Sequence, residues 1–171
     1  MTENHSALFA TPAGRRWLFG ILYLSEGAPI GFIWWALPAI LTDRGLDLVA
    51  VTTLASLLTI PWVGKFLIGP LIDAGCRRGQ SLRSWITICQ LCMGFTLLPL
   101  IFLDWSSQYS LLASLLFVHA CFAATQDVAI DTLAIRSVPA DELAKINGWM
   151  QAGMLGGRAC VAAGAVTLAA A

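Results

Sequence analysis

Five ionisable residues lie within long apolar stretches of this sequence: Glu26, Lys65, Asp127, Asp131 and Arg158. A charged side chain inside a bilayer costs about 2.5–3.5 kcal/mol on insertion scales, so such groups face a protein interior or a watery cavity. A carboxylate in a low dielectric favours its protonated form, and a nearby cation favours the charged form again. These residue types are therefore candidates for binding a polar solute or for taking up and releasing a proton.

Their positions along the chain allow two ion pairs. Glu26 and Arg158 both fall near the middle of their apolar stretches, and Lys65 falls at a depth similar to that of Asp127 and Asp131. One helical turn separates the two aspartates, so they share a helix face. We expect Glu26 to pair with Arg158, and Lys65 to pair with Asp127 or Asp131. The alternative is that either pair only fixes helix packing.

The residues around Glu26 predict an irregular helix. Gly27, Pro29 and Gly31 follow it closely, and a proline inside a helix frees a carbonyl that needs another partner. Broken helices near the bilayer midplane are where transporters bind substrates and ions. The alternative is a kink that only fits a neighbouring helix.

Aromatic and polar residues in the same stretches are weaker candidates. Trp34, Trp35 and Trp62 are mid-span or nearly so and could stack on a flat ligand, although packing or lipid contact also explains them. Gln126 precedes Asp127 directly and could contribute to the same polar site. Cys89 and Cys92 form a C-x-x-C spacing with no second cysteine pair, so we expect no metal site. We likewise expect no cofactor and no catalytic constellation, and hence no enzyme.

The elements that must position these groups are membrane-spanning helices. Hydrophobic residues make up 58% of the chain, charged residues 12%, and the net charge is zero. A span needs about 20 mostly apolar residues, and five such stretches occur at 17–41, 48–71, 85–103, 109–135 and 146–171. The sequence predicts an all-α polytopic membrane protein whose surroundings are the lipid bilayer. No basic stripe suggests nucleic-acid binding.

The placement of the basic residues predicts the orientation. They gather in the tail at residues 1–16 and in alternate connections, whereas the opposite side has Arg44 alone beside acidic residues. The basic residues of the first group are Arg15, Arg16, Arg77, Arg78, Arg83, Arg136 and Lys145. By the positive-inside bias we expect a cytoplasmic N-terminus in a multi-pass membrane protein.

The segment that follows the second apolar stretch resembles the loop motif of the major facilitator superfamily. The matching positions are Gly69, Leu71, Asp73, Arg77 and Arg78, whereas Ala74 stands where a basic residue is usual and Cys76 where glycine is usual. The resemblance implies a loop that gates alternating access by exchanging charge contacts. We expect Gly69, Asp73, Arg77 and Arg78 to belong to this gate.

A second resemblance is more specific. Residues 124–131, which include Gln126, Asp127 and Asp131, are similar to the muropeptide permease and acetyl-coenzyme A transporter group, as are residues 27–29 and 65–73. The resemblance implies a twelve-helix symporter of the inner (plasma) membrane that imports a small solute with protons. The solute would be a cell-wall muropeptide or an acyl-coenzyme A-like compound. Residues 17–171 would then be helices 1–5 of the N-terminal six-helix bundle, and the C-terminal half of the same transporter would be missing from this fragment.

A membrane scaffold or subunit without transport activity is the competing hypothesis. Gly153, Gly156 and Gly157 form a run of small residues that would permit close packing against another helix. A scaffold, however, gives no reason for five ionisable side chains within the spans. The ionisable groups therefore favour a transporter.

Overall fold

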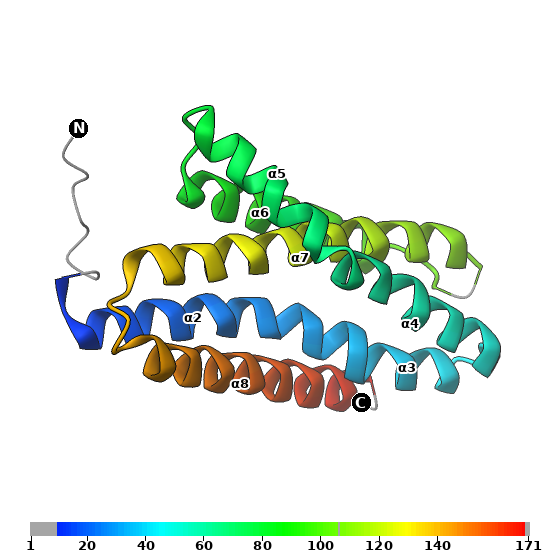
Figure 1. Ribbon diagram of the computed structural model, residues 1–171. Coiled ribbons are helices and arrows are strands. Elements are labelled where there is room, and N and C mark those ends of the chain that lie inside the picture. The colour runs from blue at the N-terminus through cyan, green and yellow to red at the C-terminus, as the bar shows by residue number, and fades with distance from the viewer. Residues whose placement is uncertain (1–9, 106, 170–171) are drawn as a thin grey trace. The chain divides into compact units, whose positions relative to one another are not determined.

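The computed structural model describes residues 10–105 and 107–169, in which helices account for the regular structure and no strand occurs. In chain order the elements are α2 (Pro12–Gly31), a π-helical segment η1 (Phe32–Ala36), α3 (Leu37–Asp43), α4 (Leu48–Val63), α5 (Lys65–Arg77), α6 (Leu82–Leu97), a 3₁₀ segment η2 (Leu98–Ile101), α7 (Tyr109–Ser137) and α8 (Leu143–Ala169) (Figure 1).

The described helices confirm the predicted all-α membrane class. Four of them, Pro12–Asp43, Leu82–Ile101, Tyr109–Ser137 and Leu143–Ala169, are long and apolar enough to cross a bilayer, and the bent pair α4 and α5 makes a fifth when counted as one span. The chain divides into two compact units. The first unit comprises Met1–Ala36 and Asp131–Ala171, and the second comprises Leu37–Ile130.

Helix α2 in the first unit begins earlier than the predicted residue 17. Thr11 is its N-cap, and the Thr11 hydroxyl accepts a hydrogen bond of 3.1 Å from the Gly14 amide. Pro12 follows at the first helical position, where its missing N–H costs nothing. The irregular backbone predicted near Pro29 is present as the π-helical segment that begins at Phe32.

Helices α2 and α8 lie side by side along the first unit, and glycines make their contact (Figure 1). A Cβ on Gly27 would lie 2.3 Å from the Met154 carbonyl oxygen, and a Cβ on Gly157 would lie 2.3 Å from the Leu24 carbonyl oxygen. Backbone atoms on the neighbouring helix cannot give way as a flexible side chain would. The contact therefore depends on residues without a side chain, as in close helix pairs within membranes.

The second predicted span, 48–71, is not one straight helix. Helices α4 and α5 of the second unit meet at Gly64 with a bend of 43°. Pro61 lies just before the bend. Its ring removes a backbone donor and clashes with the carbonyl four residues earlier, so the helix breaks here and a new one begins at Lys65.

The predicted gating loop is wrong in its backbone conformation, because α5 continues to Arg77. Its C-cap is Arg78, and Gly79 follows with a φ of +91°, which is accessible to glycine. The Gln80 amide there donates to the Gly75 carbonyl at 3.1 Å, and the Gly79 amide donates to the Cys76 carbonyl at 3.0 Å. This pair of bonds is a Schellman C-cap. The turn chemistry that ends the helix therefore lies at Gly79 rather than directly after Leu71.

Candidate functional site

A lysine at the break between α4 and α5 contacts an aspartate of α7. Lys65 is the first residue of α5, and its Nζ forms an ion pair with Oδ2 of Asp127 on α7. The same Nζ lies 4.2 Å from the centroid of the Trp62 ring, within the range of a cation–π contact. The Lys65 side chain is 31% exposed and that of Asp127 is 8% exposed. Of the two predicted partners for Lys65, the structure shows Asp127.

Gln126, beside this ion pair in the sequence, is fully buried. Its Oε1 and Nε2 atoms have no hydrogen-bond partner among the described residues. An unsatisfied buried amide costs about 1–3 kcal/mol. Adjacent residues on a helix do not face each other, so Gln126 is a separate polar group next to the ion pair in the sequence. We call Trp62, Lys65 and Asp127 the Lys65 site.

The first unit holds a second polar group on α2 and α7. Glu26 is fully buried, and Tyr23, one turn earlier on α2, donates its hydroxyl to Oδ1 of Asp131 at 2.5 Å. Sequence reasoning missed Tyr23. Its spacing of three residues from Glu26 puts both side chains on one helix face, which was the available signal.

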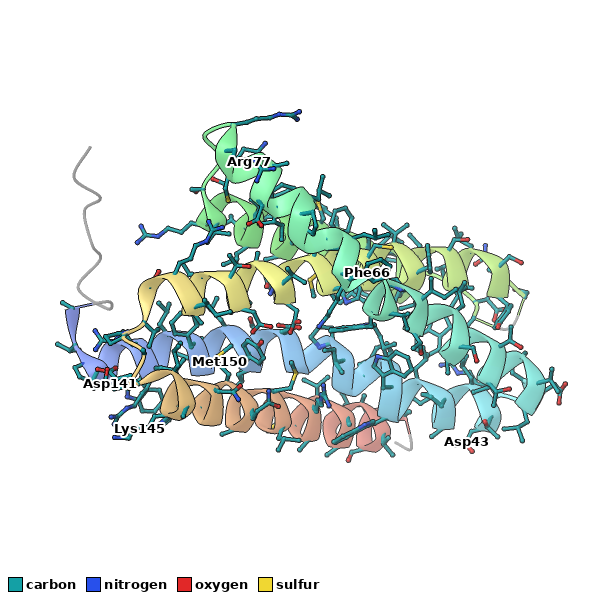
Figure 2. The ribbon with its side chains drawn as sticks, in the orientation of Figure 1. Asp43, Phe66, Arg77, Asp141, Lys145 and Met150 are labelled. Atoms are coloured by element: carbon teal, nitrogen blue, oxygen red, sulfur yellow. The ribbon has the colours of Figure 1, made fainter. Side chains whose placement is uncertain are left out.

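Asp131 also lines a pocket of about 380 Å³ in the first unit, together with Asn147, Ile146 and Met150. Met150 is labelled on α8 in Figure 2. Pockets that hold small molecules have volumes of about 300–1,000 Å³ and are mostly apolar with a few polar groups. This pocket meets both conditions, and Asp131 is an acidic residue of its lining.

Arg158 lies on the packed face of α8, where its backbone meets Gly31 of α2. The Arg158 Nε is buried and has no hydrogen-bond partner among the residues that the structure describes. The pairing of Arg158 with Glu26 stays a prediction. Both residues belong to the first unit.

The four expected gating residues follow one another along the end of α5. Gly69 and Asp73 lie within the helix, Arg77 is its last residue, and Arg78 is its C-cap. Both arginines are exposed, and Arg77 is labelled at the end of α5 in Figure 2. A rigid helix end therefore presents these charges. Their role in gating stays a prediction.

His119, Cys89 and Cys92 lie within the spans α6 and α7. His119 is buried, and its Nδ1 lies 3.1 Å from the Thr96 hydroxyl and 3.3 Å from the Met93 carbonyl oxygen. Cys89 and Cys92 are free thiols on α6. Within the described ranges no group of three or more histidine, cysteine or acidic side chains could hold a metal ion.

Membrane-length helices with buried ionisable side chains and a charged pair at a helix break define a polytopic membrane protein with polar sites inside its spans. The chain belongs to the BT1 family, whose sequence profile matches residues 26–166. That family is related to the major facilitator superfamily and includes muropeptide permeases and acetyl-coenzyme A transporters. The resemblance seen in residues 124–131 is thereby confirmed, and the family is one of membrane transporters.

The chain is also similar to individual proteins, of which one is named as a permease. The Anhydromuropeptide permease of Escherichia coli (strain K12) is 28% identical over 148 residues, covering 83% of this chain and 28% of the relative. An uncharacterized protein of Schizosaccharomyces pombe is 31% identical over 134 residues, covering 72% of this chain and 25% of the relative. An uncharacterized protein of Haemophilus influenzae is 28% identical over 142 residues, covering 78% of this chain and 32% of the relative. The chain thus spans about a quarter to a third of the length of these relatives. No solved structure matches the chain significantly.

Proposed function

We propose that this chain is the N-terminal part of a proton-coupled secondary transporter that imports a polar solute across the inner membrane, with its N-terminus in the cytoplasm. The observation that carries the proposal is the Lys65–Asp127 ion pair at the break between α4 and α5, in a chain of the BT1 family. The remaining helices of the transporter would complete the solute pathway.

The ion pair suits a transporter for a physical reason. Two charges in a span are stable together, but removing one partner leaves the other uncompensated. An incoming solute or proton that engages either charge therefore favours a rearrangement of the pair, and the broken backbone at Gly64 gives the helix a place to bend. Glu26, Asp127 and Asp131 are the groups that we propose for proton coupling.

The scaffold alternative loses its main support. Gly153 and Gly157 pack against Gly20 and Leu24 of α2 in the same chain, so this part of the small-residue run is explained without a partner protein. The buried charges remain unexplained by a scaffold.

The substrate class follows from a relative. One similar protein is named an Anhydromuropeptide permease, and we propose that the solute is an anhydromuropeptide. An acyl-coenzyme A-like solute is the alternative named by the family resemblance. Both are anionic and polar, so a lysine in the span is compatible with either.

The test is uptake by the full-length protein in proteoliposomes. Labelled anhydromuropeptide should accumulate faster with a proton gradient directed inward than without one, and an acyl-coenzyme A should not compete. Asp127→Asn should abolish the gradient-dependent part, whereas Asp141→Asn, an exposed aspartate outside the site, should leave it unchanged. Equal uptake rates with and without the proton gradient in the unmodified protein would refute proton coupling. Competition by acyl-coenzyme A alone would refute the muropeptide assignment.

A further inference from the structure

A second pocket, of about 490 Å³, lies within the second unit among α5, α6 and α7. Its walls are mostly apolar, with a few polar groups among the lining residues. The lining residues include Leu71, Gln80, Ser84, Trp85, Ile88 and Phe122. None of the three residues of the Lys65 site lines this pocket, so it is a separate feature of the fold.

The indole of Trp85 supplies a donor with no acceptor. The Trp85 Nε1 atom is buried and lacks a hydrogen-bond partner in the described part of the chain. The ring is held by close contact with α5, because a Cβ on Gly75 would lie 2.9 Å from Cζ2 and 3.0 Å from Nε1 of Trp85. A buried N–H without a partner costs about 1–3 kcal/mol. This donor therefore indicates a ligand that brings an acceptor oxygen.

The pocket lies near the end of a span. Helix α6 begins at Leu82, and at about 1.5 Å rise per residue Trp85 and Ile88 lie roughly 5 and 9 Å along it. Tryptophan is enriched where the ends of spans meet the lipid headgroups. Leu71 and Ile88 are 57% and 58% exposed, so the pocket opens onto an apolar outer surface.

The segment that joins α5 to α6 beside the pocket is basic. Arg77 and Arg78 end α5, and Arg83 is in the first turn of α6. No acidic residue occurs from Arg77 to Trp85. Basic residues at a membrane surface attract anionic lipids with about 1 kcal/mol each. These positive charges therefore favour a lipid whose headgroup carries a phosphate and no cation of its own.

We propose that this pocket binds one anionic phospholipid. One acyl chain lies against Leu71, Ile88 and Phe122, the Trp85 Nε1–H donates to an ester carbonyl oxygen, and the arginines bind the phosphate. The proposal is independent of the transported solute, because it uses neither the Lys65 site nor the pocket at Asp131.

The test uses the purified full-length protein in detergent, titrated with phosphatidylglycerol and with phosphatidylcholine of the same acyl chains. Native mass spectrometry counts the bound lipid, and thermal denaturation measures the shift in Tm. We expect tighter binding and a larger Tm shift with phosphatidylglycerol. Trp85→Phe keeps the ring and removes the donor, and should weaken binding about threefold to tenfold, as the loss of one hydrogen bond does. Trp149→Phe, at an exposed tryptophan of α8, should leave it unchanged.

Two further arms separate the possible ligands. Arg83→Gln should weaken the binding of phosphatidylglycerol more than that of phosphatidylcholine, and should therefore reduce the preference for phosphatidylglycerol. Soluble glycerol 1-phosphate, which carries the phosphate without acyl chains, should not raise Tm. Equal binding of the two lipids, an equal effect of Trp85→Phe and Trp149→Phe, or full stabilisation by glycerol 1-phosphate would each overturn the proposal.

Discussion

The Lys65 ammonium at the start of α5 and the Asp127 carboxylate of α7 form an ion pair within the second unit. Removing one partner of a buried pair costs about 3–5 kcal/mol because the other charge is left uncompensated, whereas replacing both is often neutral. The Lys65 side chain is 31% exposed, so the effect should fall below that range.

We therefore predict that Lys65→Met and Asp127→Asn each lower Tm, and that the double variant recovers most of the loss. Thermal denaturation of the four proteins in one detergent measures the coupling between the two substitutions. Strictly additive losses would show that the pair contributes no coupling energy. Loss of uptake in the stable double variant would separate a transport role from a packing role.

The glycine contact between α2 and α8 makes a second prediction. At Gly157 a Cβ would lie 2.3 Å from the Leu24 carbonyl oxygen, whereas at neighbouring Gly156 nothing lies within 4 Å. Gly157→Ala should destabilise the protein by about 1–3 kcal/mol, as overpacking of a tight contact does. Gly156→Ala should be neutral or stabilising by up to about 1 kcal/mol, since alanine favours helix. Equal Tm values for the two variants would contradict the close crossing.

Much of this fold follows from hydropathy alone. Four predicted stretches overlap helices long and apolar enough to cross a bilayer, and the fifth overlaps the bent pair α4 and α5. The pattern is readable because lipid requires every backbone group to be satisfied within a helix. The break at Gly64 was not predicted, although Pro61 and Gly64 were its local signal. The extension of α5 through the motif was missed because its end depends on the backbone conformation of Gly79, which no hydropathy pattern reports.

The candidate site was predictable only in part. The cost of charge in lipid singled out Lys65 and Asp127, and depth along the helices limited Lys65 to two partners. The choice of Asp127 depends on the rotation of α7 relative to α5, which is set by side-chain packing. Tyr23 was missed because a tyrosine in a span is ordinarily read as an interface residue.

The Tyr23–Asp131 hydrogen bond allows a third prediction, with a matched control. Tyr23→Phe removes the 2.5 Å bond to Asp131, and Tyr109→Phe removes the 2.7 Å bond from Tyr109 to the Ala50 carbonyl oxygen. Each loss should lower the free energy of unfolding by about 0.5–3 kcal/mol. The upper end of this range applies where the acceptor is charged, and the lower end where it is a neutral carbonyl.

Only Tyr23→Phe should also alter transport, because Asp131 lines the 380 Å³ pocket. Uptake as a function of solute concentration should give a changed KM for Tyr23→Phe, and an unchanged KM for Tyr109→Phe. Identical kinetics in the two variants would show that Tyr23 contributes to packing alone.

A fourth prediction concerns pH and the connection that precedes α8. The Arg15 Nε donates to Oε2 of Glu142 at 3.0 Å, and a second guanidinium nitrogen donates to Oε1 at 2.6 Å. This hydrogen bonding to Arg15 is the main reason that the pKa of Glu142 lies below its ordinary value, and the charges of Arg16 and Lys145 lower it further.

The direction of the pH effect follows from that lowered pKa. Above the ordinary glutamate pKa of about 4.3, the carboxylate is ionised in both states and its stabilising contribution is complete. As the pH falls below this value the unfolded chain takes up the proton first, so the contribution decreases, and it is lost once the pH passes the lower folded-state pKa. Tm of the unmodified protein should therefore fall more steeply below pH 4.3 than Tm of Glu142→Gln, which has no carboxylate to titrate there. Asp141→Asn, at the exposed neighbouring position, should keep the steep slope. If Glu142→Gln and the unmodified protein lose stability in parallel, the Arg15–Glu142 pair does not hold α2 to the start of α8.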